Sequence, residues 1–243
     1  MCLILFGVRP NEHYRLVVAA NRDEFYGRPA SRADFWEDEP GILAGRDLEA
    51  KGTWLGVSRS GRFAAVTNFR EDPPDPVPPR TRGDLPRDFL AGDAGAEDYL
   101  LRVAEAGHQY RGFNLVVDDG REAWYYSNRI DAPQPLAPGF YGLSNQLLDC
   151  DWPKVNEGRD ALKDIVSGNR NLSETRPAMK ALLLDEGDGR PFSNPFINTA
   201  EYGTCAASLL LVSTAGEVSF TEYGFSHHGQ PDGERHHQFK IER

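Results

Sequence analysis

Short apolar segments separated by polar turns recur along the chain. Residues 2–8 and 14–20, for example, lie on either side of the polar segment 9–13. Such pairs predict β-hairpins, because a tight turn can join two antiparallel strands. The predicted pairs are 2–8 with 14–20, 53–58 with 62–69, 113–118 with 122–127, and 208–213 with 218–223.

Helical signals occupy blocks of their own between the hairpins. Helices are expected over residues 84–91, 96–106, 152–166 and 175–184, and Pro153 stands in a first-turn position, where its missing N–H is tolerated. Strands and helices in separate blocks are typical of an α+β protein with antiparallel sheets. We expect one domain over residues 1–225, followed by a mobile polar tail over residues 226–243.

The charge and the cysteines narrow the class of protein. Acidic residues outnumber basic ones by 37 to 27, giving a formal charge of −10. This charge argues against a nucleic-acid partner and against an anionic membrane surface. The sequence contains no apolar stretch near the roughly 20 residues that span a bilayer, so no integral membrane segment is expected. Three cysteines without metal-ligand spacing favour a reducing, cytoplasmic location.

Cys2 is the first candidate for chemistry. Removal of Met1 would make Cys2 the N-terminal residue, with a thiol and an α-amine on the same residue. An α-amine titrates at about 8 and a thiol at about 8.5, so the neutral amine can accept the thiol proton. The alternative is a buried cysteine at the start of an apolar strand, and position alone favours that alternative.

A polar tetrapeptide, Asn21-Arg22-Asp23-Glu24, directly follows the second predicted strand. If the strand continues, Asn21 and Asp23 point to one face and Arg22 and Glu24 to the other. One of these carboxylates could reach the strand that carries Cys2 and hold its α-amine. The alternative is a solvated strand end with an Arg–Glu pair.

Two asparagines are candidates for stabilising an oxyanion. Asn68 ends the predicted strand 63–68, and Asn145 ends the predicted strand 139–145. An amidase needs donors that point at the tetrahedral oxyanion, and a backbone N–H beside a side-chain amide is sufficient. The alternative for both is turn chemistry, because Asn is favoured where strands stop.

A set of short motifs, in order along the chain, carries a family resemblance. The motifs are Met1-Cys2, Asn21-Arg22-Asp23-Glu24, Gly52-Thr53-Trp54-Leu55-Gly56, Asn68-Phe69-Arg70, Arg82-Gly83-Asp84-Leu85, Tyr141-Gly142-Leu143-Ser144-Asn145, Trp152-Pro153-Lys154 and Tyr202-Gly203-Thr204. Together they span nearly the whole chain. The ordered set resembles the transport and Golgi organisation protein 2 family, also called NRDE proteins.

That family in turn resembles, more remotely, the cholylglycine hydrolase and penicillin V acylase branch of the N-terminal-nucleophile hydrolases. The resemblance implies an αββα sandwich of four layers, with two antiparallel sheets. It also implies that Cys2 is the nucleophile, that Asp23 binds the amine, and that the Asn68 backbone and the Asn145 side chain form the oxyanion hole.

Two positions depart from these patterns. This chain has Ala20 where the hydrolase branch has an arginine, and Arg22 is expected to substitute for it in part. It has Cys205 where the family usually has an arginine after Tyr-Gly-Thr. Cys205 itself is expected to be an inert buried residue, because no neighbouring His or Lys would lower its pKa.

Two functions follow from the residues and the resemblance. The first is an amidohydrolase that cleaves a non-peptide C–N bond in a small amide or acyl-type substrate, without a metal or cofactor. The second is a non-catalytic carrier in haem or acyl-lipid trafficking that uses the same cleft. The tail contains His227, His228, His236 and His237, but they lack the one-face spacing of a preformed site, so no metal is assigned to them.

Overall fold

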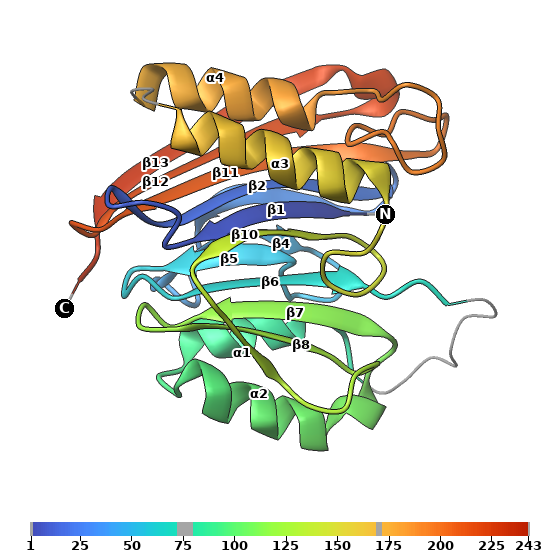
Figure 1. The fold of residues 1–243 in the computed structure, drawn as a ribbon. Coiled ribbons are helices and arrows are strands. Elements are labelled where there is room, and N and C mark those ends of the chain that lie inside the picture. Colours follow the sequence, from blue (N-terminus) through green and yellow to red (C-terminus); the bar gives the residue numbers. More distant parts are fainter. Residues whose placement is uncertain (1, 72–79, 169–171, 243) are drawn as a thin grey trace. The chain divides into compact units, whose positions relative to one another are not determined.

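The computed structural model describes residues 2–71, 80–168 and 172–242, which form two compact units (Figure 1). The first unit lies within Met1–Arg28, Pro138–Ser144 and Leu148–Phe239. The second lies within Pro29–Ala137, Asn145–Leu147 and Lys240–Arg243. Each unit is built around one antiparallel sheet.

The first unit contains a six-stranded sheet in the order β10-β1-β2-β11-β12-β13. Its strands are β1 (Leu3–Val8), β2 (Tyr14–Phe25), β10 (Gly139–Leu143), β11 (Tyr202–Ser213), β12 (Glu217–Phe225) and β13 (Pro231–Lys240). The β1–β2 hairpin confirms the first predicted pair. However, β2 continues past the predicted end at residue 20, because β11 pairs with it as far as Phe25. The tetrapeptide 21–24 therefore lies within a strand.

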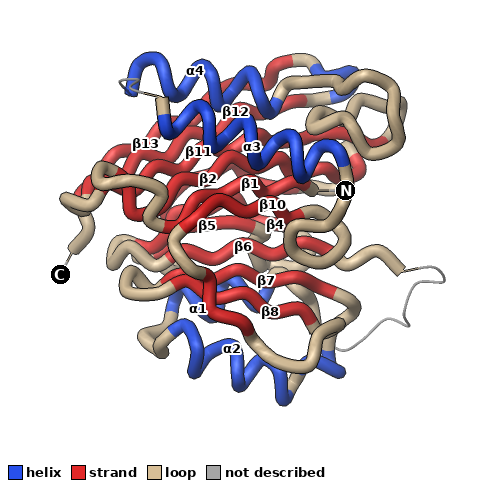
Figure 2. Tube along the Cα trace, in the orientation of Figure 1, coloured by secondary structure: helices blue, strands red, loops and turns tan. Residues whose placement is uncertain are grey.

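Helices α3 (Pro153–Ser167) and α4 (Leu172–Leu183) cover one face of this sheet (Figures 1 and 2). Alternate strand residues such as Leu3, Leu5, Val17 and Ala19 form a buried core with apolar residues of the two helices. Helix α3 approaches the sheet closely at Gly158, where an added Cβ would lie only 2.8 Å from a methyl carbon of Leu5. This close approach packs the first half of α3 against β1.

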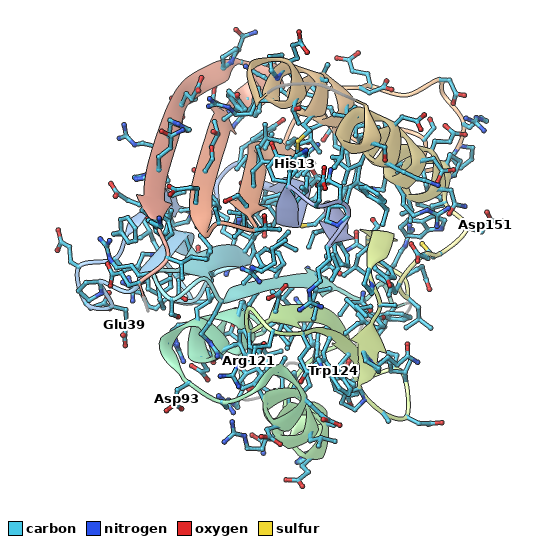
Figure 3. All side chains as sticks on the ribbon, turned by 60° about the vertical axis from the view of Figure 1, so that its left-hand side comes forward. His13, Glu39, Asp93, Arg121, Trp124 and Asp151 are labelled. Atoms are coloured by element: carbon cyan, nitrogen blue, oxygen red, sulfur yellow. The ribbon has the colours of Figure 1, made fainter. Side chains whose placement is uncertain are left out.

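The second unit contains a seven-stranded sheet in the order β3-β4-β5-β6-β7-β8-β9. Its strands are β3 (Ala30–Phe35), β4 (Ile42–Asp47), β5 (Leu55–Ser58), β6 (Phe63–Asn68), β7 (Phe113–Asp118), β8 (Ala123–Ser127) and β9 (Gln134–Leu136). Helices α1 (Asp84–Ala91) and α2 (Ala96–Glu105) pack on this sheet. Trp124 of β8 belongs to their shared core, whereas Glu39, Asp93 and Arg121 are exposed (Figure 3).

The α+β class with antiparallel sheets is confirmed, and the described residues contain four α-helices at the predicted places. Strands β3, β4 and β9 were not predicted. The prediction of a mobile tail over residues 226–243 is wrong for residues 227–240, which form the 3-10 helix η2 (His227–Gly229) and strand β13. The backbone of β13 pairs with β12, which orders a segment whose side chains are mostly exposed. A single domain over residues 1–225 stays a prediction.

Candidate functional site

Cys2 directly precedes β1 and lies beside the polar end of β2. The first pair of the β1–β2 register is Leu3 with Asn21, so Cys2 is next to the segment that carries Arg22 and Asp23. The Cys2 Sγ is half-buried and lies 3.9 Å from the Asp23 carbonyl oxygen. The Cys2 carbonyl oxygen accepts a hydrogen bond of 2.7 Å from the Ser144 hydroxyl. These contacts hold the start of β1 between β2 and the segment that follows β10.

Asp23 faces the helix-covered side of its sheet because side chains alternate along β2. Val17 and Ala19 contact the helices, so Asn21 and Asp23 point to the same side. Asn21 confirms this direction by donating to the Leu183 carbonyl of α4, at 2.7 Å. Asp23 is only 4% exposed. The extended strand therefore turns a carboxyl group into the interior.

The two oxygens of the Asp23 carboxylate differ in their hydrogen bonds. Thr204, the register partner of Asp23 on β11, donates its hydroxyl to Asp23 Oδ1 at 2.7 Å. The Thr204 hydroxyl in turn accepts the Ile197 backbone N–H at 3.0 Å, which fixes its direction. Asp23 Oδ2 is buried and has no hydrogen-bond partner among the described residues.

Burial raises the pKa of Asp23 to about 6, against the lowering effects of the charge on the chain's N-terminus, the Lys154 charge, the Thr204 hydrogen bond and the Arg22 charge. The folded protein thus holds the pKa of this carboxyl well above its ordinary value of 3.8. A group that could donate to Oδ2, such as an ammonium, would favour the ionised form.

Lys154 is a second buried charged residue of this unit. It lies in the first turn of α3, is 2% exposed, and its Nζ has no hydrogen-bond partner among the described residues. Burial lowers its pKa, while the charges of Asp23 and Cys2 act in the opposite direction. Its backbone is anchored by a 3.0 Å hydrogen bond from the Lys154 N–H to the Phe192 carbonyl. The start of α3 lies at the same end of the sheet as the start of β1 (Figure 1), and Gly158, one turn after Lys154, packs against Leu5 of β1. The first turn of α3 thus brings a buried ammonium to the region of Cys2 and Asp23.

Burial raises the pKa of all three thiols, Cys2, Cys150 and Cys205. The direction of the pKa change therefore does not single out Cys2. The surroundings of Cys2 distinguish it from the other two thiols, because Cys2 lies near both the Asp23 carboxyl and the Lys154 ammonium.

Arg22 and Glu24 project from the other face of β2. Arg22 Nη2 lies 3.8 Å from Glu24 Oε2, so the predicted Arg–Glu pair is present alongside the buried Asp23. Cys205 is the extra residue of a β-bulge in β11, where the register passes from Thr204 to Ala206. Its Sγ lies 3.7 Å from the Glu24 carbonyl oxygen. The Arg22 charge acts on both Cys205 and Asp23, where it partly opposes the rise in pKa that burial causes. Arg22 therefore brings a positive charge to the region of Ala20 and Cys205, the two positions that depart from the expected pattern.

The two predicted oxyanion residues lie together in the second unit. Asn68 is the last residue of β6 and is exposed, and Asn145 is 5% exposed. The Asn145 side-chain amide donates to the Asn68 carbonyl at 2.8 Å, and the Asn145 carbonyl accepts the Arg70 backbone N–H at 2.8 Å. The structure thus joins Asn68 to Asn145 in one unit and Cys2 to Asp23 in the other. The assignment of all four to one site stays a prediction.

Within residues 2–71, 80–168 and 172–242, no group of three or more His, Cys, Asp or Glu side chains is arranged to hold a metal ion. The tail histidine His236 instead meets the Thr221 hydroxyl of β12, with 2.8 Å between Nδ1 and Oγ1. In the same described residues, no helix combines the length and the apolar character that a bilayer crossing requires.

Three residues of the Cys2 region were missed as site residues, although each lies in a motif of the sequence: Ser144, Lys154 and Thr204. Lys154 carries a signal that could have been used. A cation in the first turn of a helix opposes the helix dipole, so a lysine directly after Pro153 is unfavourable on the helix's own account. Thr204 and Ser144 carry no such signal, because hydroxyls are common in strands and turns.

Comparison with known proteins shows which family the sequence is similar to. A family model described as Transport and Golgi organisation 2 matches residues 1–227. The Transport and Golgi organization 2 homolog of Mus musculus is 37% identical, over 91% of this chain and 92% of its own length. The Transport and Golgi organization protein 2 of Drosophila melanogaster is 27% identical, over 95% of each chain.

One solved structure supports the expected likeness in fold. It is the Caenorhabditis elegans N-acylethanolamine-hydrolyzing acid amidase ortholog, with a TM-score of 0.51 and 12% identity. The match covers 87% of this chain and 92% of that one. At this identity the likeness concerns the fold alone.

Proposed function

The chain belongs to the transport and Golgi organisation 2 family, and on that premise we propose that it is an amidohydrolase with Cys2 as its nucleophile. The substrate class is a small, non-peptide amide with an acyl group on one side of the C–N bond. The observation that carries the proposal is the Asp23 carboxylate beside Cys2, with Oδ1 held by Thr204 and Oδ2 buried without a hydrogen-bond partner in the described residues.

Removal of Met1 exposes the α-amine that the reaction needs. A carboxylate oxygen that lacks a donor is a suitable partner for the new ammonium, and the pair would offset the cost of burying the Asp23 charge. Asp23 would thereby fix the position of the amine relative to the thiol. Ser144 contributes from the other side, because its hydroxyl holds the Cys2 carbonyl oxygen.

The reaction has two steps. The neutral α-amine accepts the thiol proton and the Cys2 Sγ attacks the amide carbonyl carbon, forming an S–C bond. The C–N bond then breaks, and the α-ammonium returns the proton to the leaving amine. In the second step, water attacks the thioester with the amine as base, which releases the carboxylic acid and restores the thiol.

Asn68 and Asn145 are proposed to stabilise the tetrahedral oxyanion of both steps. This assignment rests on the family resemblance, with the Asn68 backbone N–H and the Asn145 side-chain amide as donors. The 2.8 Å hydrogen bond from the Asn145 side chain to the Asn68 carbonyl supports this assignment. It fixes the orientation of the Asn145 amide relative to the backbone of Asn68. We place the reaction in the cytoplasm, in keeping with the three free cysteines.

The test combines the intact mass with turnover of a panel of N-acyl aminomethylcoumarin amides that differ in acyl chain length. The mass is expected to show the loss of Met1. We expect Cys2→Ala to lower kcat by at least about a thousandfold, because it removes the nucleophile. Cys150→Ala and Cys205→Ala serve as matched thiol controls and are expected to keep their activity. Full turnover by Cys2→Ala would contradict the proposal.

A carrier function is the second candidate, favoured by the names of the curated relatives, which refer to transport. It would bind haem or an acyl lipid without cutting it. Saturable, stoichiometric binding that survives Cys2→Ala, together with no amide turnover, is the expected result for a carrier. The absence of a spectral shift on titration with haem would count against the haem version.

A further inference from the structure

Lys154 is placed where a lysine is unfavourable for two independent reasons. Its side chain is 2% exposed, and its ammonium makes no hydrogen bond within the described residues. It also lies in the first turn of α3, where the partial positive charge of the helix terminus repels a cation. Lys163, on the same helix, is exposed and carries neither cost. A residue that carries two costs to stability is more readily explained by function than by folding.

The groups around Lys154 identify what its charge acts on. Asp23 of β2, Cys2 before β1 and Cys150 in the segment before α3 all act on the Lys154 ammonium. Arg22 is a further cation that acts on both Asp23 and Cys2. Lys154 is therefore part of a cluster with Cys2 and Asp23, although no hydrogen bond fixes it to the buried Asp23 Oδ2.

Lys154 and Arg22 are the side-chain cations that act on the carboxylate and the thiol of this cluster, and Lys154 is the more deeply buried of the two. In the proposed reaction the proton moves from the thiol to the α-amine, so Cys2 carries a thiolate and an ammonium at once. Asp23 pairs with the ammonium, which leaves the thiolate close to a carboxylate in a buried region. Two buried like charges repel strongly unless a cation is near, and the buried Lys154 ammonium supplies one alongside the Arg22 guanidinium.

We propose that Lys154 is a positioning residue of the Cys2 centre, whose buried ammonium offsets the Asp23 carboxylate and so allows the Cys2 thiolate to form. The inference rests on the proposed function, since it assigns Lys154 to the same nucleophile. It adds a third member to the Cys2 and Asp23 pair, supplied by a helix rather than by the sheet.

The test follows the rate of Cys2 alkylation by iodoacetamide between pH 6 and pH 10, with peptide mapping to separate Cys2 from Cys150 and Cys205. Lys154→Met keeps the length of the side chain and removes the charge. At pH 7.5 we expect it to lower the Cys2 rate at least about tenfold and to move the pH profile to higher pH. Lys154→Arg, which keeps the charge, is expected to restore most of the rate. Lys163→Met is the matched control on α3 and is expected to leave the profile unchanged.

An unchanged Cys2 profile in Lys154→Met would overturn the inference. If Lys154→Met fails to fold, the reciprocal effect decides the question. Titration of lysine [13Cε] signals is then compared between the unsubstituted chain and Cys2→Ser. The Lys154 pKa is expected to fall in Cys2→Ser, because the thiolate that favours the ammonium is gone. An equal Lys154 pKa in both chains would overturn the inference.

The two proposals fail in different ways. If Cys2→Ala abolishes amide turnover and Lys154→Met leaves the alkylation profile unchanged, only the inference about Lys154 is wrong. If Cys2→Ala retains full turnover while Lys154→Met slows alkylation, the hydrolase proposal is wrong and the electrostatic effect of Lys154 stands.

Discussion

Two buried cations, Arg62 of the second unit and Lys154 of the first, differ in their hydrogen bonds. In the second unit, the guanidinium of the buried Arg62 donates to the Phe89 carbonyl at 3.0 Å and to the Ala94 carbonyl at 2.7 Å. In the first unit, Lys154 Nζ and Asp23 Oδ2 are buried without hydrogen-bond partners among the described residues. A buried charge with its hydrogen bonds made is a structural element, whereas one without them is a cost to stability. These two unsatisfied charged groups of the first unit are those that the proposals place at the Cys2 site.

The largest expected effect on stability comes from removing the Arg62 guanidinium, whose hydrogen bonds are made. Arg62→Met removes two charge-assisted hydrogen bonds and the contact of the guanidinium with the Phe89 ring, 3.9 Å away. We expect the free energy of unfolding to fall by about 3–5 kcal/mol. Urea denaturation measures it, with the exposed Arg121→Met as control. A loss below about 1 kcal/mol would remove the contrast between the units.

Asp23→Asn is expected to act in the opposite direction. The folded pKa of Asp23 is raised from 3.8 to about 6, so its favourable contribution is complete below pH 3.8 and is lost as the pH rises through 6. At pH 7.5, Asp23→Asn should therefore be more stable by up to about 3 kcal/mol, and the difference should vanish near pH 4.

The pKa of about 6 already includes the lowering effect of the charge on the chain's N-terminus, so the prediction for Asp23→Asn applies to chains that keep Met1. In chains that have lost Met1, the Cys2 ammonium would stabilise the Asp23 carboxylate, so the gain should be smaller. Urea denaturation of both forms at pH 4 and pH 7.5 checks this. The quantity to compare is the stability of Asp23→Asn minus that of the parent chain. A fall in this difference between pH 4 and pH 7.5 would contradict the burial of an ionised Asp23.

The smallest expected effect concerns Thr204. Thr204→Val removes the donor to Asp23 Oδ1 and the acceptor of the Ile197 N–H. We expect a loss of about 1–2 kcal/mol in the free energy of unfolding. Thr204→Ser keeps the hydroxyl and should retain most of this stability. A Thr204→Ser chain as unstable as Thr204→Val would show that the methyl group, rather than the hydrogen bonds, matters at this position.

Much of the fold could be predicted because its elements carry their own signals. Helix α1 has the predicted bounds, and the hairpins follow from apolar segments around turns. β3 has exposed and half-buried residues at most positions, and β9 has only three residues, so neither shows a clear apolar pattern. The continuation of β2 through a polar tetrapeptide depends on its distant partner β11, which no local pattern reveals.

The site residues on the sheet could be predicted from the sequence, whereas the burial of Lys154 on helix α3 could not. Alternation alone places Asn21 and Asp23 on one face of β2, as the structure has them. The burial of Lys154 depends on the packing of α3 against the sheet, which no local pattern reveals. For the same reason the pairing of Asn68 with Asn145, far apart in the sequence, appears only in three dimensions.

The composition of β13 has a consequence for self-association. This strand ends the six-stranded sheet, with β12 on one side of it. An outermost strand presents backbone groups that can template the addition of a strand from another molecule. Here the segment begins with Pro231 and carries Asp232, Glu234 and Arg235, all exposed. Proline removes a donor and the charges disfavour an incoming apolar strand, so this border of the sheet is protected against fibril-like stacking of one copy on another.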